Sequence, residues 1–169
     1  MTKQHATKIH RPVNPPVGWG RAATAAALGL FLVAAASPPA VAAPGDFVTK
    51  TVKGSFAKTV TKLKKAITGA KLVIVKEVPF TAMLGMVGTK AEKMKGFEIF
   101  HPRYGKVIYN NDKNAFLEAP LRIFVQDQGG KVMIRYRKPS AVFAGYSGLS
   151  KLGKDLDGLF AKIVTRTAG

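Results

Sequence analysis

Four side chains in the carboxyl-terminal half of the sequence carry the clearest potential for chemistry: Arg122, Phe124, Arg135 and Arg137. They occupy alternate positions of two neighbouring segments, and alternate side chains of a strand point to the same side of a sheet. Guanidinium groups bind phosphate and carboxylate, and an aromatic ring can stack on a flat ligand. We therefore predict a basic sheet face that binds an anionic envelope or extracellular partner, either an anionic polymer or lipid headgroups, and no specific nucleic acid. A solvated face that keeps the protein soluble is the alternative.

A second candidate site combines two thioethers, an imidazole and a phenol: Met83, Met86, His101 and Tyr104. The methionine segment lies between glycines, and His101 closes a predicted strand, so these residues are candidates for a pocket that carries a small hydrophobic ligand. A histidine paired with a methionine could also bind haem or copper. The alternative is a histidine bonded to the backbone, with methionines that fill gaps in the core.

The rest of the composition limits the reactions that the protein can catalyse. Its 169 residues include 0 Cys and 3 His, so the chain has no disulfide, thiolate metal site or cysteine nucleophile. Two of the histidines, His5 and His10, lie close to the start of the chain, which excludes a site built from several histidines. No paired carboxylates, glycine-rich phosphate loop, Gly-x-Ser-x-Gly or His-Glu-x-x-His pattern occurs. We expect a protein that is not an enzyme and has no cofactor.

Residues 1–42 are typical of a secretory signal peptide. Residues 1–21 carry four basic and no acidic residues, residues 22–36 form an apolar run, and Ala40-Val41-Ala42 offers a small-x-small cleavage site. The apolar run, at a rise of about 1.5 Å per residue, is too short to span comfortably the ~30 Å core of a bilayer. We predict cleavage between Ala42 and Ala43, export to the periplasm or the medium, and no membrane span afterwards. An uncleaved anchor is the alternative.

Residues 43–169 have the length of a single domain. Removing the four basic residues of the signal peptide lowers the formal net charge from +18 to +14, so the predicted mature protein remains strongly basic. A chain of this length can bury about two thirds of its unfolded surface. Since no disulfide is available, the hydrophobic core alone must hold the fold.

Hydrophobic periodicity predicts the elements of this domain. The expected strands span residues 47–54, 72–78, 96–102, 121–127 and 131–137. The last two alternate apolar and polar side chains around a Gln-Gly-Gly turn and give the clearest hairpin. One helix is expected between the N-cap Ser55 and the C-cap Gly69, and another along the apolar stripe of residues 149–164.

Two further segments are less regular. Residues 104–110 fit one or two helical turns, whereas residues 81–95 show no clear period. The order of strand, helix, several strands and helix predicts an α+β domain. In this class an antiparallel sheet carries both helices on one face.

Three sequence motifs in this order are similar to those of a known family. They are SFAKTVTKL at residues 55–63, IFHPRYG at 99–105, and PLRIFVQD at 120–127 followed by GKV and YRKP. Their order and spacing over residues 48–164 resemble the secreted branch of the domain of unknown function 302 family. The resemblance implies a β-α-β-β-β-β-α fold, similar to one half of the TATA-binding protein, and no established activity. Phe100-His101 and Val78-Pro79-Phe80 stand where many relatives carry Gly-Asn and Asp-His, so no histidine chemistry is carried over.

Overall fold

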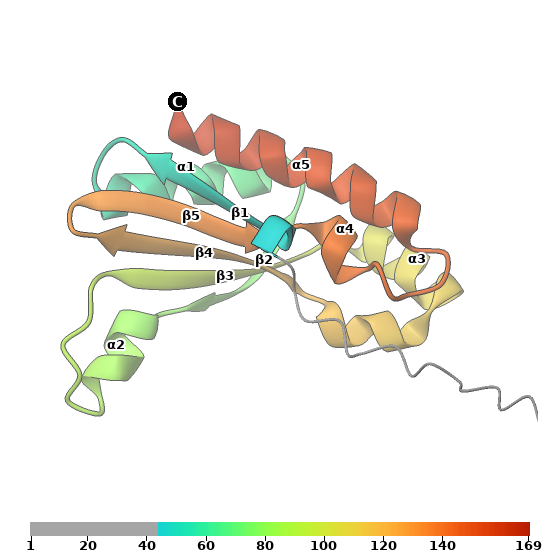
Figure 1. The fold of residues 1–169 in the computed structure, drawn as a ribbon, viewed down its shortest axis with the longest axis horizontal. Helices are drawn as coiled ribbons and strands as arrows, with labels where there is room; N and C mark the ends of the chain where they lie inside the picture. Colours follow the sequence, from blue (N-terminus) through green and yellow to red (C-terminus); the bar gives the residue numbers. More distant parts are fainter. Residues whose placement is uncertain (1–43) are drawn as a thin grey trace, which may run out of the picture. The chain divides into compact units, whose positions relative to one another are not determined.

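A five-stranded antiparallel sheet forms the centre of the domain (Figure 1). The structure is a computed structural model and describes residues 44–169, so the predicted signal peptide, residues 1–42, and the cleavage residues Ala42 and Ala43 lie outside the described residues. The strands are β1 (Phe47–Val52), β2 (Val73–Val78), β3 (Met94–Phe100), β4 (Leu121–Gln128) and β5 (Lys131–Arg137). Their order in the sheet is β1-β5-β4-β3-β2, and every neighbouring pair is antiparallel. The predicted α+β fold is confirmed.

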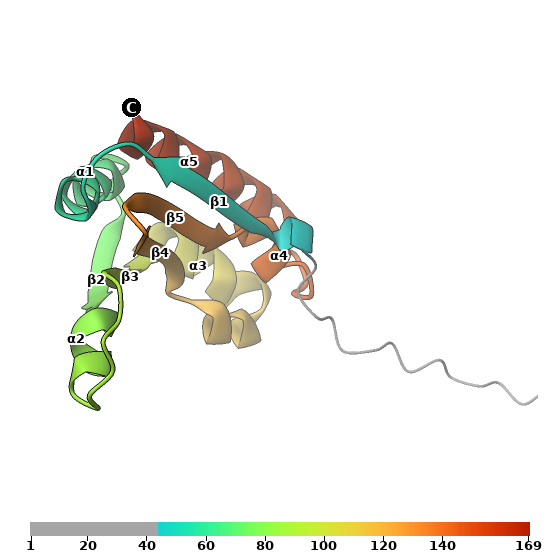
Figure 2. The same ribbon diagram turned by 60° about the vertical axis from the view of Figure 1, so that its left-hand side comes forward.

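Two long helices, α1 (Phe56–Gly69) and α5 (Ser150–Ala168), pack against each other and against the sheet (Figures 1 and 2). The shorter helices are α2 (Phe80–Gly85), α3 (Pro102–Asn111) and α4 (Pro139–Val142), and two 3-10 helices span Pro44–Asp46 (η1) and Lys113–Glu118 (η2). Residues 81–95, which showed no clear period in the sequence, contain most of α2 and the start of β3. Within the described residues no helix is long and apolar enough to cross a bilayer.

Local capping explains where α1 begins and ends. The Ser55 Oγ accepts a hydrogen bond from the Lys58 backbone N–H at 3.4 Å, as expected of an N-cap. The predicted C-cap was wrong by one residue, because Gly69 is the last helical residue and Ala70 is the cap. Lys71 follows with a positive φ of 59°, which turns the chain toward β2.

The core lies between the sheet and the two long helices. Alternate residues of the β4–β5 hairpin enter it, and Ile123, Val125 and Ile134 are fully buried. Leu63 of α1 and Ile163 of α5 cover them from the helix side. Each such side chain contributes about 1.5–3 kcal/mol through burial. A second buried cluster, formed by Ile108, Ala115, Phe143, Leu149, Leu152 and Leu156, joins α3, η2 and α4 to the start of α5.

The other side of the sheet is called here the open face, because α1 and α5 do not cover it. Side chains alternate along each strand, so the residues between the core positions point to this face. The short helix α2 lies at the far end of β2 from α1 and rests against β3 (Figures 1 and 2). The open face therefore has α2 at one end, and residues of η2 and α4 border it at the other.

Candidate anion-binding site on the open face of the sheet

The register of the strands brings the predicted basic residues to the open face. Phe124 of β4 lies opposite Arg135 of β5, and Arg122 lies opposite Glu98 of β3. Arg137 is paired with Phe47 of β1. The structure thus places all four predicted residues on one side of the central strands.

Each arginine has an identifiable partner, and those of Arg122 and Arg135 lie on the open face. The Arg122 Nε lies 3.5 Å from Glu98 Oε1, and the Arg122 side chain is 77% exposed, so this ion pair is a weak surface contact. Arg135 donates from Nη1 to Gln126 Oε1 at 3.2 Å and from Nη2 to Met133 Sδ at 3.7 Å. These partners of Arg135 are neutral, so its positive charge remains uncompensated by these contacts.

Arg137 differs from the other two because part of its guanidinium is buried. Its Nη2 donates to the Ala141 carbonyl oxygen at 3.4 Å, whereas its Nε is buried and has no hydrogen-bond partner among the described residues. An unpaired buried donor costs about 1–3 kcal/mol, and more when the group is charged.

Arg122 and Arg137 line the same hollow, of about 310 Å³. We call it the arginine hollow; its other lining residues are Phe47, Leu117, Glu118, Pro120, Leu121 and Val142. The Glu118 carboxylate accepts a hydrogen bond from the Tyr146 hydroxyl at 3.2 Å, and burial together with this bond raises the pKa of Tyr146. The hydroxyl therefore stays protonated at neutral pH and donates to Glu118, the acidic residue that lines the hollow.

Two further hollows continue from the arginine hollow toward α2. The first, the central groove, has a volume of about 430 Å³ and is lined by Lys76, Val78, Phe80, Gly96, Phe97, Glu98, Arg122, Ile123 and Phe124. The second, the α2 groove, measures about 500 Å³ and is lined by Phe80, Met83, Leu84, Met94 and Phe124. The rings of Phe80 and Phe124 meet edge to face, with centroids 5.9 Å apart, and line both.

The predicted pocket of Met83, Met86, His101 and Tyr104 does not form. The methionines belong to α2 and its C-cap, before β3 begins, whereas His101 and Tyr104 follow the end of β3. A strand of this length separates its ends by about 20 Å. Met86 is 85% exposed and lines none of the hollows described above.

His101 instead serves α3 as its N-cap. Its Nδ1 accepts a hydrogen bond from the Arg103 N–H at 3.0 Å, and its ring lies 5.3 Å from that of Tyr104. Both residues line an apolar cavity of only about 30 Å³, which has room for little more than a water molecule. The combination of histidine and methionine suggested for haem or copper is therefore not present. Among residues 44–169 there is also no cluster of three or more His, Asp or Glu that could hold a metal ion.

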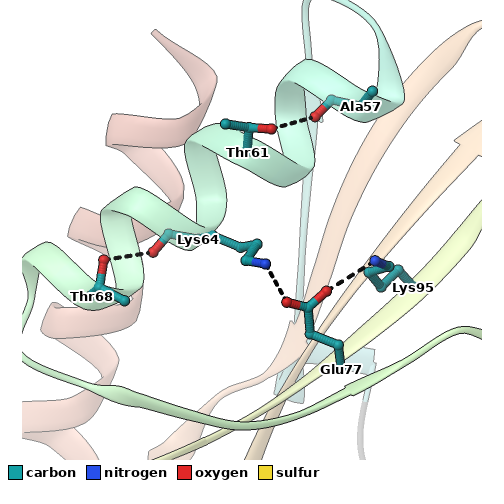
Figure 3. Close-up of polar contacts among 6 residues, drawn as sticks. All are labelled: Ala57, Thr61, Lys64, Thr68, Glu77 and Lys95. Carbon is teal, nitrogen blue, oxygen red and sulfur yellow. Dashed lines mark hydrogen bonds and ion pairs between the residues drawn. The ribbon is translucent and has the colours of Figure 1, made fainter.

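Ion pairs between lysine and glutamate side chains connect α1 to the sheet, on the side opposite the arginines. Figure 3 shows Lys64 of α1 and Lys95 of β3 converging on the carboxylate of Glu77 in β2. The Lys95 Nζ lies 2.9 Å from Glu77 Oε2. The hydrogen bonds from Lys64 and Lys95 lower the pKa of Glu77. This glutamate is engaged in the fold and does not reduce the charge of the open face.

The sequence patterns did not reveal Phe80, Gly96 and Met94 as parts of a site. The available signal was the glycine that begins the predicted strand of residues 96–102, since a strand glycine often marks the close approach of another group. Here that group is the ring of Phe80. The pairing of Lys76, Glu98 and Arg122 across three strands had no sequence signal, because it depends on the register.

These observations define an α+β domain with two long helices on one face of an antiparallel sheet and a basic, grooved opposite face. The sequence model of the family described as "Domain of unknown function DUF302" matches residues 48–166, and the chain belongs to this family. The solved structure described as "uncharacterized conserved protein DUF302 from Bacillus stearothermophilus" superposes with a TM-score of 0.68 at 17% identity. The match covers 72% of this chain and 98% of that one, and it shows a shared fold. None of the curated proteins matches the chain.

Proposed function

We propose that this protein is exported and binds a ligand through an anionic group, phosphate or carboxylate, in the arginine hollow without catalysing its conversion. The observation that carries the proposal is that two guanidinium groups, those of Arg122 and Arg137, line one hollow. An oxyanion in the hollow would lie beside both of them.

The electrostatics of the open face favour the same ligand class. Arg122 is held by a single ion pair to Glu98 and is mostly exposed, so it can turn toward an anion at little cost. Arg135 adds a charge that its two contacts leave uncompensated. The formal net charge of +14 that residues 43–169 carry attracts anions from solution, but without selecting among them. The two arginines of the hollow supply the selective part, because a guanidinium binds an oxyanion in a fixed fork geometry.

The surroundings of the acidic residues support binding over catalysis. Glu77, Glu98, Glu118 and Asp157 are held in ion pairs or hydrogen bonds within the fold. His101, the one histidine of residues 44–169, uses its Nδ1 to cap α3. None of these groups lies beside the arginines as a free base or nucleophile. Export rests on the composition of residues 1–42.

Calorimetric titration with tripolyphosphate at low ionic strength tests the proposal. Arg137→Gln should weaken binding about ten- to a hundredfold, since it removes a charge-assisted hydrogen bond. Arg135→Gln is the matched control, because it removes one charge from the same face but not from the hollow. Glu98→Gln should strengthen binding about two- to fivefold by freeing Arg122. Thermal unfolding of each variant establishes that the fold persists.

A second comparison separates the hollow from the general positive charge. Lys58 and Lys62 are exposed on α1, on the other side of the sheet. Changing both to Gln should reduce tripolyphosphate affinity far less than changing Arg122 and Arg137 together. Equal losses from the two double variants would mean that only the diffuse field of the protein binds anions, and the proposal would be rejected.

A further inference from the structure

The three hollows of the open face adjoin one another through shared lining residues, and together they are called the open-face groove. Arg122 lines both the arginine hollow and the central groove, while Phe80 and Phe124 line both the central groove and the α2 groove. Arg122 and Phe124 are two residues apart in β4, about 6.6 Å along the strand. A single extended ligand can therefore contact the guanidinium end and the α2 end at once.

The two ends of this groove differ in chemistry. The arginine hollow presents the guanidinium groups of Arg122 and Arg137. The α2 groove is lined by phenylalanine, methionine and leucine side chains alone, and Phe80 and Met83 are 37% and 51% exposed. Apolar side chains that share one exposed hollow are typical of binding sites for apolar groups.

The middle of the groove offers apolar contacts to such a ligand. Gly96 has no side chain and the ring of Phe80 occupies the space above it, so this apolar ring covers the strip between Val78 and Phe124. Glu98 is the acidic residue that lines the central groove, and it lies opposite both Lys76 and Arg122 in the register. It forms an ion pair with Arg122, so its charge is directed toward that cation.

On these grounds, and resting on the proposed function, we infer that the ligand is an anionic amphiphile with a single oxyanionic head and an apolar chain. The head binds in the arginine hollow, beside the guanidinium groups of Arg122 and Arg137. The chain runs through the central groove past Phe124 and ends in the α2 groove against Met83. Charge complementarity fixes the orientation, since the exposed apolar side chains lie at one end and the two guanidinium groups at the other.

A homologous series of methyl, butyl and octyl phosphate, each kept below its aggregation concentration, tests the inference by calorimetry. Burial of the chain should raise the affinity by about two- to fourfold per methylene, so octyl phosphate should bind at least about tenfold more tightly than butyl phosphate. Met83→Gln should flatten this dependence on chain length and leave methyl phosphate unaffected. Met86→Gln is the matched control, since Met86 is equally apolar and more exposed but lines none of the three hollows.

The outcomes separate the inference from the function on which it rests. If all three phosphates bind equally and Arg137→Gln weakens each, the anion site stands and the amphiphile inference is overturned. If affinity grows with chain length but Arg137→Gln has no effect, the groove is a purely apolar site and the proposed function fails. Equal effects of Met83→Gln and Met86→Gln would show that the exposed tip around α2, rather than the groove, contacts the chain, and would also overturn the inference.

Discussion

The ring of Phe80 rests directly on the backbone of Gly96: a Cβ placed on Gly96 would lie 2.8 Å from Cε2 of that ring. This contact seats the start of α2 on β3 and brings Phe80 to the edge of Phe124, 5.9 Å away between centroids. The apolar end of the open-face groove therefore depends on one position that has no side chain.

Gly96→Ala should displace the ring of Phe80 and loosen α2 while the core stays intact. Amide hydrogen exchange in residues 80–85 should become faster, and octyl phosphate affinity should fall while tripolyphosphate affinity stays the same. Gly85→Ala is the control within α2, since a Cβ there would meet no atom within 4 Å. Unchanged exchange in the Gly96→Ala variant would show that the Phe80 contact does not hold α2 in place.

Two glycines of α5 should respond in opposite directions to the same substitution. A Cβ at Gly153 would lie 2.7 Å from the backbone Cα of Ser140 in α4, so Gly153→Ala should destabilise the fold by about 1–3 kcal/mol. At Gly158 a Cβ meets nothing within 4 Å, and alanine there should stabilise the helix by about 0.5–1 kcal/mol. Denaturant unfolding of both variants provides the measurement. If Gly153→Ala is as stable as the parent, α4 does not pack on α5 as described.

The ion pairs of Glu77 predict a specific dependence of stability on pH. Hydrogen bonds from Lys64 and Lys95 hold the pKa of Glu77 below its usual 4.5. A carboxyl group whose pKa is lower in the folded state stabilises the fold above its unfolded-state pKa, and this stabilisation is lost as the pH falls through the folded value. The loss of unfolding free energy caused by Glu77→Gln should be constant near neutral pH and disappear as the pH falls below 4.5.

The size of this effect should be no more than about 1 kcal/mol, because the carboxylate remains partly exposed to solvent. Once Lys64 and Lys95 are both replaced with Gln, the Glu77→Gln substitution should no longer change the unfolding free energy in a pH-dependent way. A difference that persists at all pH values would point to packing by the glutamate stem instead of its charge.

The predicted export determines the amino-terminal residue of the mature protein. Protein isolated from the envelope or the medium of its host should begin at Ala43, because the peptidase cleaves after small-x-small residues. Amino-terminal sequencing, or intact mass, reads this directly. A protein that retains Met1 and stays in the cytosol would contradict both the signal peptide and the proposed place of action.

The sequence predicted elements well wherever a pattern was long. Alternation along residues 121–137 was enough for the hairpin and its two faces, and the stripe of residues 149–164 marked the closing helix. Ser55 marked the start of α1 through its own hydrogen bond. Helix α2 was missed because its six residues complete fewer than two turns, which is too short to show a period.

Spatial relationships that depend on register could be predicted only in part. Arg122, Phe124, Arg135 and Arg137 lie within one hairpin, so alternation alone placed them on one face. Met83 and His101 were grouped by residue type, but the whole of β3 separates them. Arg137 donates to the Ala141 carbonyl oxygen of α4 while its Nε stays unpaired, an arrangement that no local pattern encodes.

The guanidinium of Arg137 is also the group through which the central claim can be tested most directly. Its Nε–H resonance in a 15N–1H correlation spectrum can be assigned by its absence from the Arg137→Gln variant, and followed during titration with octyl phosphate. Binding in the arginine hollow predicts a saturable shift of this resonance, with the same half-saturation as the calorimetric titration. An unmoved Arg137 resonance at saturating ligand, with shifts confined to the lysines of α1, would contradict anion binding on the open face.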